Sequence, residues 1–73
     1  MNRTRIEVLG LEDDDAAARL EKSLTARTGV PRAVVDPNIQ IAEVSYDPEV
    51  VSPGDIVRWI RAAGYDARFA GSP

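Results

Sequence analysis

The sequence predicts an α+β fold in which two helices cover one face of a four-stranded antiparallel sheet. Two segments repeat apolar residues with helical spacing, and four short segments alternate in polarity or are rich in β-branched residues. These segments follow one another in the order β-α-β-β-α-β. A chain of 73 residues is long enough for one small domain, so we expect residues 1–73 to form a single domain with its core over about 4–69.

The first two elements are expected over residues 4–8 and 14–28. The strand alternates, so that Ile6 and Val8 share one face with Thr4 while Arg5 and Glu7 take the other. In the helix, apolar side chains recur at i, i+3 and i+7, which predicts a buried stripe of Ala17, Leu20 and Leu24. Gly29 stands where a left-handed residue commonly ends a helix.

A hairpin is expected over residues 30–48, with its turn at Pro37 and Asn38. Pro31 near the start of the first strand predicts an edge strand, because proline cannot donate a hydrogen bond to a neighbour. In the second strand one face should carry Ala42, Val44 and Tyr46. The other face should carry Ile39, Ile41 and Glu43.

The second helix has a clear start signal in "SPGD", residues 52–55. Ser52 suits the N-cap, Pro53 the first helical position, and Asp55 the reciprocal place of a capping box. Its buried stripe is predicted to be Ile56, Trp59, Ile60 and Ala63. Gly64 should end the helix, and a last strand should follow over residues 65–69. A βαββαβ sandwich of this kind is the ferredoxin-like arrangement.

Composition excludes several classes of function. The chain has no Cys and no His, so it lacks thiolate and imidazole ligands and the commonest general base. The net charge of −3 argues against nucleic acid as a partner. There is no apolar run long enough to span a membrane and no signal-peptide pattern, so a cytoplasmic location without direct membrane insertion is expected. We predict that the domain is not an enzyme.

From about Arg5 to Arg68 the chain resembles the heavy-metal-associated domain of P-type metal ATPases and metallochaperones. The resemblance is carried by "VLGL" (8–11), "ARLEKSL" (18–24), "TGV" (28–30), "VSYDPEVVS" (44–52) and "AAGYDA" (62–67). It implies the same ferredoxin-like fold. It also implies a cytosolic N-terminal accessory or regulatory domain of a P-type cation-transporting ATPase, or a stand-alone protein similar to a metallochaperone.

The resemblance fails at the metal-binding signature, Gly-Met-x-Cys-x-x-Cys. Gly10 and Leu11 match its first two positions, but Asp13 stands at the first Cys and Ala16 at the second. Copper(I) prefers thiolate or thioether ligands. We therefore expect no useful affinity for Cu(I).

The acidic run Glu12, Asp13, Asp14 and Asp15 supports two interpretations. Carboxylates at this loop could bind a hard divalent ion weakly, with Mg, Mn, Zn or Ni as the candidates. Alternatively, Asp13 or Asp14 caps the helix and the remaining acids interact with its dipole. Consecutive side chains at a helix start point in different directions, which makes the capping interpretation the stronger of the two.

The open face of the sheet is the second candidate site. Val34, Ile39 and Ile41 are expected to lie there together, and a contiguous apolar cluster commonly marks a contact surface. The partners expected are other domains of a membrane transporter, a separate protein, or a second copy of the chain in a weak homodimer.

Overall fold

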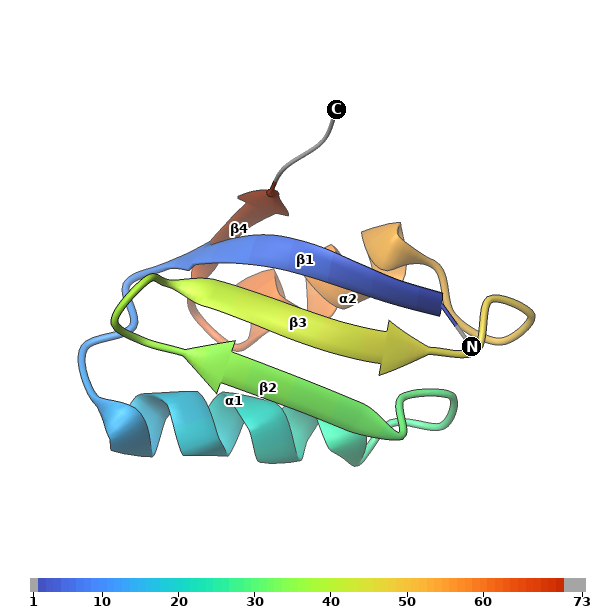
Figure 1. Ribbon diagram of the computed structural model, residues 1–73, viewed down its shortest axis with the longest axis horizontal. Coiled ribbons are helices and arrows are strands. Elements are labelled where there is room, and N and C mark those ends of the chain that lie inside the picture. Colours follow the sequence, from blue (N-terminus) through green and yellow to red (C-terminus); the bar gives the residue numbers. More distant parts are fainter. Residues whose placement is uncertain (1, 71–73) are drawn as a thin grey trace.

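The computed structural model describes residues 2–70 and confirms the predicted βαββαβ order (Figure 1). The elements are β1 (Asn2–Leu9), α1 (Asp14–Thr25), β2 (Arg32–Asp36), β3 (Ile41–Tyr46), α2 (Pro53–Ala62) and β4 (Asp66–Phe69). The strands form one sheet in the order β2-β3-β1-β4, and every neighbouring pair is antiparallel. Pro31 thus precedes an edge strand, as predicted.

Both helices lie on the same side of the sheet, and the other face is open (Figure 1). The core between the two layers includes Ile6 and Val8 of β1, the predicted stripe of α1 and the inward residues of β3. All of these side chains are at least nine-tenths buried. Each fully buried Ile or Leu stabilises the fold by roughly 1.5–3 kcal/mol, so this single layer of contacts holds the domain together.

The end of α1 differs from the prediction. The helix stops at Thr25 with Ala26 as its C-cap, rather than continuing to residue 28. Gly29 does adopt a left-handed φ of +92°, but it serves a turn beyond the helix. A Cβ at this position would lie 2.7 Å from a methyl of Val51 and 2.9 Å from one of Val50. Glycine is required here because two loops pass close together.

The predicted buried stripe of α2 was partly wrong. The buried residues are Ile56, Val57 and Ile60, whereas Ala63 is exposed and Trp59 is only partly covered. The guanidinium of Arg27, just beyond α1, lies 4.4 Å from the centre of the Trp59 ring. Trp59 therefore packs against the edge of the core and contacts the segment that follows α1.

The predicted ends of α2 are confirmed. The Ser52 side chain accepts a hydrogen bond from the Asp55 N–H, and the Asp55 carboxylate accepts one from the Ser52 N–H. Gly64 follows the helix with a φ of +103°. Within residues 2–70, the helices are too short and too polar to cross a bilayer.

Candidate functional site

The loop between β1 and α1 carries the acidic run, and two residues fix its path. Gly10 turns the chain with a φ of +97°, and the Tyr65 ring packs 3.7 Å from where a Cβ of Gly10 would stand. Leu11 is 6% exposed and anchors the loop in the core. Glu12 to Asp15 then follow on the surface, and all four are exposed.

Asp13 is the N-cap of α1. Its backbone is extended, with φ −155° and ψ 176°, and its Oδ1 accepts a hydrogen bond from the backbone N–H of Ala16 at 2.8 Å. The sequence had left Asp13 and Asp14 as alternative caps. Asp14 is instead the first helical residue and Asp15 the second. Their negative charges interact favourably with the positive end of the helix dipole.

A surface hollow of about 290 Å³ lies beside this cap. Three of the four predicted acids line it, namely Glu12, Asp13 and Asp15, together with Arg19 and the Tyr65 ring. Asp14 does not line it. The sequence did not single out Arg19 as part of this site, although a residue one turn beyond Asp15 lies on the same side of a helix.

Arg19 changes the electrostatics of the hollow. A guanidinium remains charged at all physiological pH values and cannot be a metal ligand. It attracts the neighbouring carboxylates and repels a divalent cation. Across residues 2–70 no three acidic side chains are placed so that they could hold one metal ion together. The geometry is that of a capped helix with a shallow acidic rim.

The open face of the sheet brings together the three predicted apolar residues. Val34 is 46% exposed and Ile39 is 59% exposed, while Ile41 is partly buried. They line a hollow of about 220 Å³ whose charged rim is Arg5, Asp36 and Glu43. Ile39 belongs to the turn before β3 rather than to the strand itself, which corrects the predicted start of that strand.

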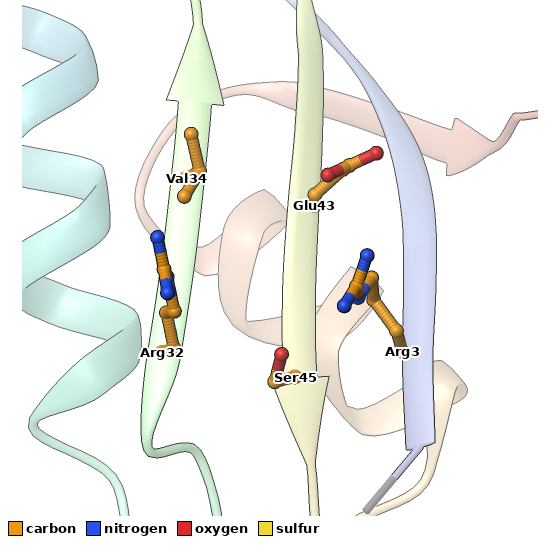
Figure 2. A pocket seen from close by; sticks show the side chains of 5 residues that line it. All are labelled: Arg3, Arg32, Val34, Glu43 and Ser45. Atoms are coloured by element: carbon orange, nitrogen blue, oxygen red, sulfur yellow. The ribbon is translucent and has the colours of Figure 1, made fainter.

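A second hollow on the same face was not predicted from the sequence. It measures about 250 Å³, and its lining residues are Arg3, Arg32, Val34, Glu43 and Ser45 (Figure 2). These residues come from β1, β2 and β3. Only the pairing register brings them together, and the register cannot be read from any one segment.

Comparison with known proteins connects the fold with metal transport. The family model described as heavy-metal-associated domain matches residues 5–66. A copper-exporting P-type ATPase of Staphylococcus saprophyticus is 32% identical over 69 residues, which are 93% of this chain and 9% of that protein. Copper-transporting ATPase 2 of Homo sapiens is 30% identical over 71 residues, covering 92% of this chain and 5% of that protein.

The fold agrees with solved structures of such domains. A copper binding domain from HMA7, a P-type ATPase, superposes with a TM-score of 0.93 at 28% identity, covering 97% of this chain and 96% of that one. The chain thus spans less than a tenth of the length of the two transporters but nearly the whole of this isolated domain.

Proposed function

Because the chain belongs to the heavy-metal-associated domain family, we propose that it is a cysteine-free accessory domain of a P-type cation-transporting ATPase, working at the cytosolic face of the membrane. The domain is a non-catalytic module. Its relation to small segments of two much longer copper ATPases supports this assignment. In the proposed role the domain regulates a transporter and does not carry a soft metal ion itself.

One observation carries the proposal. The two positions that hold thiols in the family's signature are joined here by the hydrogen bond from the Ala16 N–H to the Asp13 carboxylate. Asp13 replaces a ligand with a helix cap, and Ala16 has no ligand atom in its side chain. Gly10 and Leu11 hold the path of the loop. Where the family's signature has metal ligands, this loop has a helix cap that stabilises α1.

The loop retains at most a weak affinity for a hard divalent cation. Glu12, Asp13 and Asp15 line one hollow but are not placed to hold one ion together, so a cation would contact them through its hydration shell. This suits hydrated Mg²⁺ or Mn²⁺ better than Zn²⁺ or Ni²⁺. Asp13 already accepts a backbone hydrogen bond, and Arg19 adds an opposing charge. We expect a dissociation constant near the millimolar range, about −4 kcal/mol.

An NMR titration with Mg²⁺, Mn²⁺, Zn²⁺ and Ni²⁺ tests this part of the proposal. We expect shifts or broadening confined to residues 10–19, lost in Asp15→Asn and kept in Asp14→Asn, because Asp14 does not line the hollow. Saturation at micromolar metal would contradict the weak-site proposal. Uptake of Cu(I) from a chromogenic chelator would contradict the accessory role, since such uptake requires soft ligands.

A second candidate function is a protein interaction module that works through the open face of the sheet. The exposed cluster of Val34, Ile39 and Ile41 favours it, because these apolar side chains lie together around one hollow. The occupant would be another domain of the transporter, a separate protein or a second copy of the chain. Ile39→Asp should abolish self-association measured by sedimentation, whereas Val50→Asp, an equally exposed valine outside the cluster, should not.

A further inference from the structure

We propose that Arg3, Arg32 and Ser45 form a binding site for a phosphate group on the open face of the sheet. The three residues occupy one row of the pairing register: Ser45 of β3 is opposite Arg3 of β1 on one side and Arg32 of β2 on the other. Figure 2 shows Ser45 between the two arginines. This site is distinct from the acidic loop and does not depend on the function proposed above.

The spacing of the row suits one ligand shared by both arginines. Neighbouring strands are about 4.8 Å apart, so the strands that carry Arg3 and Arg32 are separated by about 10 Å. A small anion above Ser45 is within reach of both long side chains. The serine hydroxyl supplies a further donor from beneath, and Val34 forms an apolar wall beside it.

The charges of this row are not neutralised within the described part of the chain. Among residues 2–70 the ion pairs are Arg5–Glu43, Arg68–Glu7 and Arg58–Asp55, and none of them includes Arg3 or Arg32. Glu43 lines the hollow, but Arg5 in the next row holds its carboxylate at 3.5 Å. The hollow is therefore lined by two guanidiniums that are unpaired within residues 2–70 and by one carboxylate that is paired with Arg5, in a protein whose net charge is −3.

The donor set favours a phosphate dianion over a carboxylate. Guanidiniums bind phosphate oxygens through paired N–H groups, and each such charge-assisted bond is stronger than a neutral one. A phosphate monoester carries close to two negative charges above its second pKa of about 6, which matches the two arginines. A carboxylate carries only one negative charge and has two acceptor oxygens, so it balances the two guanidiniums less well. The hollow of about 250 Å³ has room for a tetrahedral anion.

The test is a ¹⁵N NMR titration at pH 7.5 and constant ionic strength, with inorganic phosphate, glycerol 3-phosphate, acetate and chloride as separate arms. We expect saturable shifts of the Arg3 and Arg32 Nε–H signals and of the Ser45 amide with both phosphates. Arg32→Gln should weaken binding about tenfold, which corresponds to about 1.4 kcal/mol, because it removes a charge-assisted hydrogen bond. Arg3→Gln should do the same, and Ser45→Ala should weaken it less.

Arg68→Gln is the matched control, since it removes one arginine from the same face but from an existing ion pair with Glu7. It should change phosphate affinity less than twofold. Equal losses in Arg32→Gln and Arg68→Gln would show general electrostatic attraction and overturn the site. So would equal shifts with acetate and phosphate, or shifts no larger than those caused by chloride. Binding of inorganic phosphate without glycerol 3-phosphate would restrict the ligand to the free ion.

Discussion

The carboxylate of Glu21 on α1 accepts a hydrogen bond from the backbone N–H of Val35 on β2, with the two atoms 2.7 Å apart. Val35 belongs to an edge strand, whose outward N–H groups have no neighbouring strand to bind. The Glu21 side chain covers one of these groups and ties the helix to the sheet at the same point. The contact both protects the edge and fixes the position of α1.

Glu21→Ala should lower the free energy of unfolding by about 1–3 kcal/mol, the usual cost of losing a hydrogen bond to a charged group and leaving its partner unsatisfied. Glu21→Gln should cost less, because its amide oxygen can still accept the bond. Urea denaturation measures both. Glu49→Ala, in an exposed turn, is the control and should stay within about 0.5 kcal/mol of the parent. If Glu21→Ala and Glu49→Ala lowered the free energy of unfolding by similar amounts, the hydrogen bond of Glu21 would have no special role in stability.

The cap formed by Asp13 leads to a second prediction. Asp13→Ala removes the acceptor for the Ala16 N–H and should destabilise the domain by about 1 kcal/mol. Asp13→Asn should remain within a few tenths of a kcal/mol, because asparagine caps a helix about as well. Asp14→Ala is the control for losing a charge at the same helix end. Thermal unfolding followed by circular dichroism is the measurement, and a large loss in Asp13→Asn would contradict simple capping.

The fold could be predicted because its strands alternate in polarity and because α2 has an explicit capping signal. The rotation of α2 could not be predicted. Ile56 and Ile60 fit a stripe completed by Trp59 as well as one completed by Val57, and only the surface beneath the helix decides between them. The Trp59 ring instead lies beside the guanidinium of Arg27, a residue beyond the end of α1 that the sequence of α2 alone does not indicate.

The sites show the same limit of sequence reasoning. The acidic run was evident from the sequence. Whether Asp13 or Asp14 is the cap depends on the residue at which the helix begins, and the sequence did not determine that to within one residue. The sequence did not predict that Arg3 and Arg32 lie close together. Each is opposite Ser45 only because of the register in which β1 and β2 pair with β3. Local patterns thus predict elements, whereas sites built across strands require the assembled sheet.

Asp55 should make stability depend on pH at the acidic end. The Ser52 N–H and then the Arg58 guanidinium hold the pKa of the Asp55 carboxyl below its ordinary value of 3.8. A lowered native pKa means that the ionised group stabilises the fold above pH 3.8, and that this contribution is lost as the pH falls through the lower native value. Asp55→Asn should therefore be less stable at neutral pH and lose less stability on acidification.

Melting temperatures of the parent and of Asp55→Asn, measured between pH 7 and pH 2.5, check this expectation. The difference between the two melting temperatures should become smaller as the pH falls. Glu49→Gln removes a carboxylate from an exposed turn and controls for the change of net charge. A gap between the parent and Asp55→Asn that stays constant down to the lowest pH would contradict the linkage.

Gly29 and Gly64 allow the cost of backbone conformation to be separated from the cost of a clash. Both have a left-handed φ, +92° and +103°, so alanine at either position pays the left-handed penalty of roughly 1–2 kcal/mol. Among residues 2–70, no atom other than those of Gly64 and its two chain neighbours lies within 4 Å of a Cβ built at Gly64, so Gly64→Ala should cost only that penalty. Gly29→Ala should cost distinctly more, because its Cβ would meet Val51, which is 3% exposed and held by the core.

Urea denaturation measures the difference between Gly29→Ala and Gly64→Ala. The same measurement on Val51→Ala and on the double variant Gly29→Ala/Val51→Ala tests whether the clash with Val51 is its cause. Val51→Ala alone should lower stability because it opens a cavity. In the double variant it should also relieve the clash with the Cβ at position 29. The double variant should therefore lose less stability than the sum of the losses in Gly29→Ala and Val51→Ala. Simple addition of the two costs would mean that the contact with Val51 contributes nothing to the cost of Gly29→Ala.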